Sequence, residues 1–306
     1  MISVVINYFN MPREAARSLL ALSRRYQRDI DKLDYEVIAV DNGSSQPLEE
    51  NFVRSFGPEF RHRLFQTTSP SPVEAINDAV ANDARGEYVM VMIDGAQILS
   101  PGVLNLADKA MRAFDDPFVC ATSFPLGIRK KDDPPGSYDR SVEDQQLAAA
   151  KWEEEGYRLF RLISSFGDDA YGWFGCFYES CCVCMKRSTW LDVGGFDVRF
   201  QSPGAGLASP DFFRRMLLRP HTDYVVLLGE ATFHQFHGGV ASNADLSEHP
   251  WQRFEEEYTR IRGEKFERVA RPPTYFGGFN PQSIRIAELS AQQGLAWWRA
   301  AAQPPK

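Results

Sequence analysis

The sequence of 306 residues predicts an α/β fold with a mostly parallel, doubly wound central sheet and helices on both faces. Two observations predict this fold class. In the first half of the chain, a short apolar run rich in β-branched residues, a turn and a helical stretch follow one another repeatedly. These apolar runs do not alternate with polar residues, which is typical of strands that helices cover on both faces. The second half is less regular, and we expect an irregular C-terminal half there.

The expected elements follow in order along the chain. Strands are expected at 2–7, 35–40, 62–67 and 87–93. Between them, helices that open at or near a proline are expected at 13–28, 47–56 and 72–84, and another helix should follow Pro101. The second half should contain helices at 142–163, 209–218 and 249–262, and strands at 180–186 and 223–228. A segment rich in charge, proline and glycine predicts a mobile loop at 127–141.

The composition excludes some classes of function. Lys and Arg total 34 against 41 Asp and Glu, so the net charge of −7 does not attract polyanions, and no nucleic-acid partner is expected. We interpret the five cysteines as small residues of a reducing compartment rather than as a zinc site. No basic segment precedes the apolar N-terminus, and no apolar run approaches the ~20 residues that span a bilayer. The sequence therefore predicts a cytoplasmic protein.

Polar side chains follow three of the expected strands. Asn10 follows the first strand, Asp41 the second and Asp94 the fourth. Ligands of doubly wound sheets bind beyond the carboxyl ends of the strands, so we expect these three residues to meet over one crevice. A carboxylate is costly at the end of a buried strand unless it meets a polar ligand or a cation. Asp94 is therefore a candidate binding residue.

Four segments, in order, resemble the family 2 glycosyltransferases of the GT-A fold. They are SVVINYFN (3–10), VIAVDNGSS (37–45), AINDAVANDARGEYVMVMIDGA (75–96) and MKRSTWLDVGGFDVRF (185–200). The third leads into the position of the family's DXD motif, and the fourth contains its GGFD segment. One such motif is weak support, but four in the right order are strong. The resemblance covers about residues 2–240.

The resemblance implies one GT-A domain over residues 1–306 that binds a nucleotide-sugar donor and a saccharide or glycolipid acceptor. It implies that Asp41 accepts a hydrogen bond from the base, usually uracil, and that Asn10 shapes the same pocket. Asp94 would face the ribose and the metal-bridged pyrophosphate. The implied parts are a nucleotide-sugar-binding half, an acceptor and catalytic half, and a C-terminal helical extension, at 1–100, 101–245 and 246–306.

The DXD motif is altered, because its second acidic position is Ala96. A methyl group cannot bind Mn²⁺ or Mg²⁺, so the divalent cation of the family needs another ligand, or side-chain cations must replace it. His234 and His237 lie near the usual place of a late histidine ligand. They are three residues apart and should point to opposite faces of an extended segment. We favour His237 as a metal ligand with Asp94, because two glycines follow it and permit a close turn; a packed or surface histidine is the alternative.

The usual acidic pair of the general base is also altered. Aligning LASPDFFRR by its arginines places Ala208 and Ser209 at that pair and leaves Asp211 as the carboxylate of this helix start. Asp211 is therefore the first candidate for the catalytic base, and Glu179, beside the expected acceptor loop, is the second. The alternative for Asp211 is a helix cap.

The resemblance implies an inverting glycosyltransferase, of the hexosyltransferase type, that acts in bacterial polysaccharide or glycolipid assembly. Ala96 and Ser209 leave open a non-catalytic sugar or nucleotide-binding module with the same fold. A nucleotidyltransferase fits less well, because no glycine-rich phosphate loop follows the first strand.

The tail with Trp297, Trp298 and Arg299 could contact a protein partner or lie at the inner face of the membrane. The other expectation, which we favour, is that it packs back onto the domain.

Overall fold

The computed structural model describes residues 1–128, 137–163, 171–239 and 250–301. The expected loop at 127–141 lies mostly outside these ranges. The strands are β1 (Ile2–Tyr8), β2 (Tyr35–Asp41), β3 (Phe60–Leu64), β4 (Tyr88–Met92), β5 (Gln97–Leu99), β6 (Pro117–Pro125), β7 (Cys182–Lys186), β8 (Asp223–His234) and β9 (Thr274–Gly277). The α-helices are α1 (Pro12–Leu22), α2 (Glu50–Arg54), α3 (Val73–Asp78), α4 (Val103–Ala113), α5 (Arg140–Ala150), α6 (Arg187–Asp192), α7 (Ala208–Leu218), α8 (Trp251–Arg262) and α9 (Ile284–Ala301).

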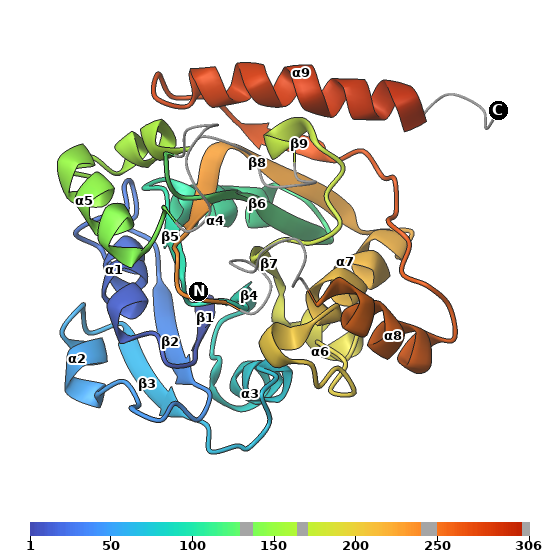
Figure 1. The fold of residues 1–306 in the computed structure, drawn as a ribbon, viewed down its shortest axis with the longest axis horizontal. Coiled ribbons are helices and arrows are strands. Elements are labelled where there is room, and N and C mark those ends of the chain that lie inside the picture. The colour runs from blue at the N-terminus through green and yellow to red at the C-terminus, as the bar shows by residue number, and fades with distance from the viewer. Residues whose placement is uncertain (129–136, 164–170, 240–249, 302–306) are drawn as a thin grey trace.

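The strands form one curled sheet that helices flank, which confirms the expected fold class (Figure 1). The strand order is β3-β2-β1-β4-β7-β6-β8-β5, and β9 pairs with β8. The pairs β1–β2, β1–β4 and β2–β3 are parallel, whereas β7 runs antiparallel to both of its neighbours. Every residue of β1 and of β2 is buried, as the apolar runs predict. The carboxyl ends of β2, β1 and β4 therefore lie side by side.

Several expected elements have different bounds. The helix expected at 13–28 ends at Leu22, because Ser23 is extended, and the strand expected at 62–67 is β3 at Phe60–Leu64. Two elements of the second half also differ. The helix expected at 142–163 ends at Ala150, because Lys151 adopts a left-handed conformation with φ of 51°; a short 3₁₀ helix, η2, follows at Gly156–Leu162. The strand expected at 223–228 continues to His234. Gly229, with φ of 77°, lies where the pairing of β6 and β8 changes register, so this glycine marks an irregularity inside β8.

The C-terminal helix packs against the rest of the chain, as one of the two expectations for the tail predicts. In α9, the Oγ atom of Ser290 donates to the carbonyl of Tyr171 at 2.6 Å, and the indole of Trp298 donates to the carbonyl of Phe174 at 3.1 Å. Both acceptors belong to the segment around a short 3₁₀ helix, η3 (Gly172–Phe174). Within the described parts of the chain, none of the helices has the length and apolar character needed to span a bilayer.

Candidate functional site

The structure places the three expected donor-binding residues at one edge of the sheet. Tyr8 at the end of β1 pairs with Asp41 at the end of β2, and β4, which precedes Asp94, pairs with the other side of β1. Asn10 follows β1 directly. Because neighbouring parallel strands end at the same edge, these residues follow adjacent strands at one edge of the sheet.

Asn10 and Asp41 both stabilise the loop that follows β2. Asn10 has a φ of 53°, a conformation that asparagine tolerates, and its side-chain oxygen accepts hydrogen bonds from the amide and the hydroxyl of Ser45, both at 2.9 Å. Asp41 is fully buried, and its two oxygens accept from the amides of Ser44 and Leu48, each at 2.9 Å. The direct contact of Asp41 with a base stays a prediction, and in this structure Asp41 shapes the loop.

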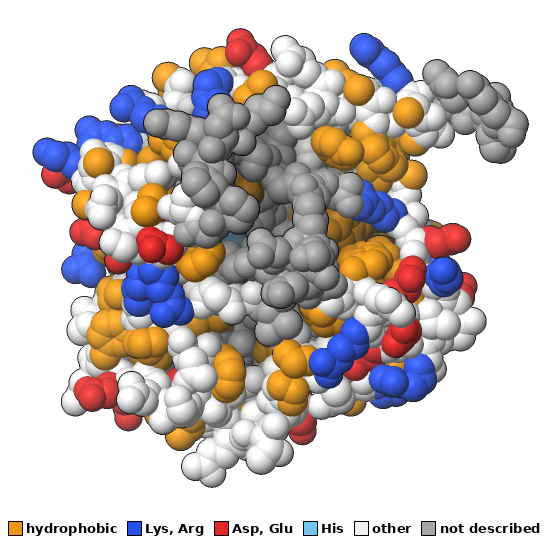
Figure 2. Space-filling view, in the orientation of Figure 1, with side chains coloured by type: hydrophobic (Ala, Val, Ile, Leu, Met, Phe, Trp, Pro, Cys, Tyr) orange, Lys and Arg blue, Asp and Glu red, His pale blue; other side chains and the backbone are white. Residues whose placement is uncertain are grey.

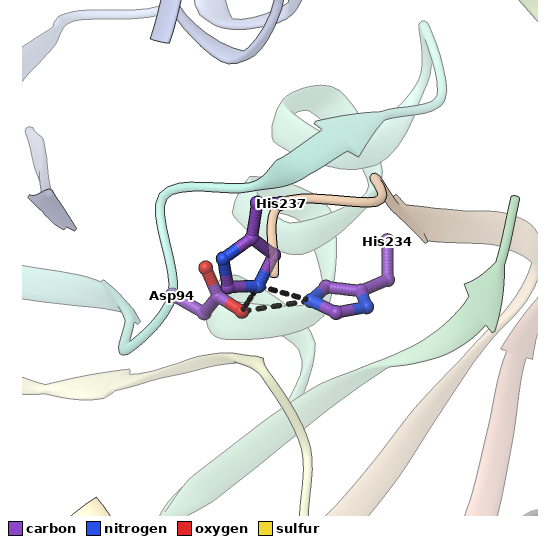
Figure 3. Close-up of side chains that lie close together, drawn as sticks. All are labelled: Asp94, His234 and His237. Carbon is purple, nitrogen blue, oxygen red and sulfur yellow. Dashed lines mark hydrogen bonds and ion pairs between the residues drawn. The ribbon is translucent and has the colours of Figure 1, made fainter. Parts of the chain in front are cut away.

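Asp94 is in contact with two histidines at the end of β8. Its Oδ2 atom lies 2.8 Å from Nε2 of His234 and 3.4 Å from Nε2 of His237, and the two Nε2 atoms are 3.2 Å apart. Both imidazole rings point toward the same carboxylate (Figure 3). All three side chains are only partly buried, with exposed fractions of 21%, 14% and 9% in the order named. Three potential ligand atoms thus converge where solvent or a ligand can reach them.

The expectation that only one of the two histidines enters the crevice is wrong. The alternation of faces applies within a strand, but β8 ends at His234 and the chain turns before His237. His234 itself reaches Asp94 because β5 pairs antiparallel with β8, so that Gln97 lies opposite His234. Both histidines thus contact the acidic residue of the Asp-Gly-Ala sequence. His234 is the functional candidate that the sequence reasoning did not select.

Interactions within the cluster shift the pKa values of Asp94 and His237. Burial acts to raise the pKa of Asp94, but the hydrogen bonds and charges of His234 and His237 outweigh it and hold that pKa well below its usual range. Burial lowers the pKa of His237, but the hydrogen bond and negative charge of Asp94 outweigh it, so this pKa is raised above 6.5. Asp94 is therefore an anion at neutral pH and strongly favours a positive charge beside it.

The sequence Asp-Gly-Ala is explained by close packing. Ala96 is fully buried; its amide donates to Oδ1 of Asp94 at 2.8 Å, and its carbonyl accepts from the amide of Gln235 at 2.9 Å. At Gly95, an added Cβ atom would overlap the ring of Tyr8 and lie 2.5 Å from the carbonyl oxygen of Asn7. The turn that presents Asp94 therefore depends on a glycine.

Gly95→Ala should destabilise the protein, because Tyr8 is fully buried and the backbone of Asn7 cannot move aside freely. We expect a loss of about 1–3 kcal/mol in the free energy of unfolding, as for other overpacked interiors. Urea unfolding followed by circular dichroism measures it. Gly278→Ala is the matched control, because a Cβ atom there meets nothing within 4 Å. Equal stability of the two variants would contradict this account.

Glu179 lies in the same electrostatic environment as the Asp94 cluster. Its side chain reaches solvent, yet burial of the surrounding site raises its pKa to about 7, with Arg268 and His234 opposing the rise. Burial, and then the negative charges of Glu179 and Asp94, also raise the pKa of the Cys181 thiol, so both carboxylates act on one side chain. A carboxyl group with a pKa near neutrality and access to solvent is suited to accept a proton from a hydroxyl.

Asp211 has different surroundings. It is 1% exposed, and it forms ion pairs with Arg215 at 2.9 Å and with Arg262 at 2.6 Å. Two guanidinium groups donate hydrogen bonds to its two oxygens, which argues against a role as proton acceptor. The role of general base, assigned by sequence first to Asp211 and second to Glu179, stays a prediction. As a helix residue, Asp211 instead joins α7 to α8.

A cavity lies beside these ion pairs rather than beside Asp94. Its lining includes Asn77, Phe196, Asp197, Arg215 and Arg262. Asp197 pairs with Arg262 at 2.9 Å, and Arg215 pairs with Asp211, so each arginine of the lining has a carboxylate partner. We therefore assign the candidate site to the Asp94 cluster, where a carboxylate meets two histidines and the pKa values of Asp94 and His237 are shifted.

Comparison with curated proteins gives one partial likeness. No family model matches the chain. Over 219 residues the chain is 26% identical to the O-antigen biosynthesis protein RfbC of Myxococcus xanthus. This match covers 67% of the chain but only 15% of the length of that relative. It therefore concerns one segment of a much longer protein.

Comparison with solved structures shows a shared fold. The chain superposes on S. aureus TarS 1-349 in complex with UDP-GlcNAc with a TM-score of 0.52 and 14% identity, covering 95% of this chain and 70% of that one. A second structure of S. aureus TarS gives a TM-score of 0.51 and 15% identity, covering 76% of this chain and 36% of that one. This likeness agrees with the fold that the four sequence motifs imply.

Proposed function

We propose that the chain is a glycosyltransferase that moves a sugar from a nucleotide-diphosphate sugar to an acceptor hydroxyl. The observation that carries the proposal is the cluster of Asp94, His234 and His237 at the carboxyl edge of the sheet. This edge also bears the loop that Asn10 and Asp41 stabilise. A doubly wound sheet binds its ligand at such an edge, and a diphosphate needs positive charge there.

The cluster has the donor atoms for one divalent cation. One ligand atom from each of Asp94, His234 and His237 lies within 4.8 Å of the other two. Two imidazoles and one carboxylate suit Mn²⁺ better than Mg²⁺, which prefers oxygen ligands throughout. When bound, the cation would supply positive charge for the leaving diphosphate. The second histidine thus offsets the ligand lost at Ala96.

A UDP-sugar is the donor that we propose. The supporting observation is that the structure of TarS with a similar fold contains UDP-GlcNAc. In this chain, the loop after β2 would surround the base. Asn10 is exposed beside this loop, and the buried Asp41 holds it through hydrogen bonds to its backbone. The preference of the protein for one hexosyl group and one base would depend on contacts of the donor with this loop.

Glu179 is the proposed general base. Its raised pKa allows it to remove the acceptor proton near neutral pH, while the hydroxyl attacks the anomeric carbon in line with the leaving diphosphate. One displacement of this kind inverts the configuration of the sugar. The acceptor would be a growing saccharide or a glycolipid in polysaccharide assembly, which the name of the Myxococcus xanthus relative supports.

Release of UDP tests the proposal. The purified protein is incubated with UDP-GlcNAc and other UDP-sugars, with Mn²⁺ or with a chelator, and free UDP is measured over time. We expect slow release of UDP without acceptor, faster with Mn²⁺. A non-catalytic sugar-binding module, which Ala96 makes the second candidate, would show a donor-induced thermal shift but no UDP release. If no donor produced either a thermal shift or UDP release, both functions would be contradicted.

Binding of Mn²⁺ should depend on pH. A cation needs neutral histidines, and the raised pKa of His237 keeps its proton in place to a higher pH than 6.5. Affinity should therefore fall as the pH is lowered through that pKa, by up to about tenfold per pH unit for one competing proton. Without metal, the stability of the fold depends on pH in the opposite direction. The Asp94–His237 pair stabilises the fold below the ordinary histidine pKa, and this contribution is lost as the pH rises through the raised pKa of His237. Calorimetric titration with Mn²⁺ between about pH 6 and pH 8 measures the effect; a constant affinity would contradict it.

A further inference from the structure

We propose that Glu143 is a positioning residue of the cation site, because it holds the backbone segment that carries His237. The inference rests on the proposed function, since it concerns the affinity of the same site for its cation. Glu143 lies in the first turn of α5 and is not one of the three candidate ligands. Its effect would pass through the chain between His234 and His237.

The backbone of Phe236, next to His237, is bound from two sides. Its amide donates to Oε2 of Glu143 at 2.7 Å, and its carbonyl accepts from Arg13 of α1 at 3.2 Å. Its ring also contacts Tyr138 edge-on, with centroids 6.0 Å apart. The residue before it is held as well, because the amide of Gln235 donates to the carbonyl of Ala96. The turn that places His237 beside Asp94 is thus fixed by contacts outside the cluster.

Glu143 is built into this contact as a buried charge. It is 1% exposed, so its ionised form needs partners inside the protein. Oε2 accepts from Phe236 and from the hydroxyl of Tyr138 at 3.0 Å, and Oε1 accepts from Arg13 at 3.1 Å. An uncharged side chain could not satisfy all these donors. The charge of Glu143 therefore couples α1, α5 and the histidine segment.

Ion pairs anchor the same contact at the surface. Arg13 and Arg17 of α1 both pair with Asp144 of α5, and Arg140 at the start of α5 donates to the carbonyl of His237 at 2.8 Å. On this face of the molecule, cationic and acidic side chains lie together over α1 and α5 (Figure 2). Phe236 and His237 are consequently both attached to side chains of α1 and α5, and the geometry of the ligands governs metal affinity.

Glu143→Gln tests the inference. Glutamine has the same shape but no charge and only one acceptor oxygen, so the Phe236 amide and Arg13 would compete for it. We expect calorimetric titration with Mn²⁺ alone to give an affinity about 10- to 100-fold weaker than that of the unmodified protein. Glu257→Gln is the matched control, because Glu257 is also buried and accepts two backbone amides, from Gln201 and Ser202, but holds a different segment. It should keep the original affinity.

A double-mutant comparison separates positioning from general loss of structure. If Glu143 acts through His237, then Glu143→Gln should have little further effect on Mn²⁺ affinity in a protein that already carries His237→Ala. Should the glutamine variant fail to fold, Glu143→Asp keeps the charge but shortens the reach to Phe236, and a smaller loss of affinity is expected. Original affinity in the Glu143 variants, or an equal loss with and without His237, would overturn this inference alone. No Mn²⁺ binding by the unmodified protein would overturn the cation proposal as well.

Discussion

Asp94→Asn should reduce the rate of UDP release by about 10³-fold, since the site would lose its anionic ligand for the cation that the leaving diphosphate needs. Asparagine keeps the shape of the side chain, and its oxygen can still accept a hydrogen bond from the amide of Ala96. The charge that holds the histidine cluster together is lost, however, so Mn²⁺ should bind much more weakly. UDP release with Mn²⁺ and calorimetric titration with Mn²⁺ measure the two effects.

Asp78→Asn is the control for this variant. Asp78 is a similarly exposed aspartate, at 28% against 21% for Asp94, and it pairs with Arg63 at 2.7 Å outside the cluster. Its loss should leave both UDP release and Mn²⁺ affinity unchanged, because exposed ion pairs contribute little. If Asp94→Asn kept normal turnover while folding normally, the cluster would have no part in catalysis and the proposed function would lose its main support.

The sequence predicted the elements whose signals are local. β1 and β2 each extend one residue beyond the expected strand, and α7 begins one residue before the expected helix, because an apolar run or a helix start specifies each of them. β6 was not expected, although it pairs with both β7 and β8 in the sheet. The extension of β8 past Gly229 was not expected either. Both depend on pairing between segments about 100 residues apart, which local patterns do not report.

The position of the candidate site could be predicted from the sequence, but the side chains that contact Asp94 and Asp211 could not. The apolar run that ends at Asp94 indicated a ligand-binding carboxylate, and the missing second acid directed attention to the late histidines. That both histidines reach Asp94 follows from the antiparallel pairing of β5 with β8. A pair of histidines around the end of a strand, followed by glycine, was the signal that could have found His234. Asp211 pairs with Arg215 of α7 and with Arg262 of α8. No local pattern around Asp211 predicts the pair with Arg262, which lies 51 residues further along the chain.

Glu179→Gln should lower kcat by about 10² to 10⁴-fold while KM for the donor changes little, because a general base acts in the transition state and does not bind the nucleotide. The unmodified enzyme should lose activity as the pH falls below about 7, where the carboxyl group becomes protonated. The glutamine variant should lack this acidic limb of the pH profile. Initial rates of transfer between about pH 5.5 and pH 8.5, with an acceptor present, measure both effects.

Asp211→Asn separates the two candidate bases. Asp211 pairs with Arg215 and Arg262, so its neutralisation weakens both ion pairs and should lower the unfolding midpoint in urea, although Arg262 keeps its pair with Asp197. The folded fraction should nevertheless keep a kcat within about threefold of the original and the same acidic limb, because Glu179 still accepts the proton. A loss of kcat and of the acidic limb in this variant, with normal turnover of Glu179→Gln, would instead assign the base to Asp211. Since the two guanidinium groups occupy both of its oxygens, Asp211 would then require a rearrangement of α7 against α8 before it could accept a proton.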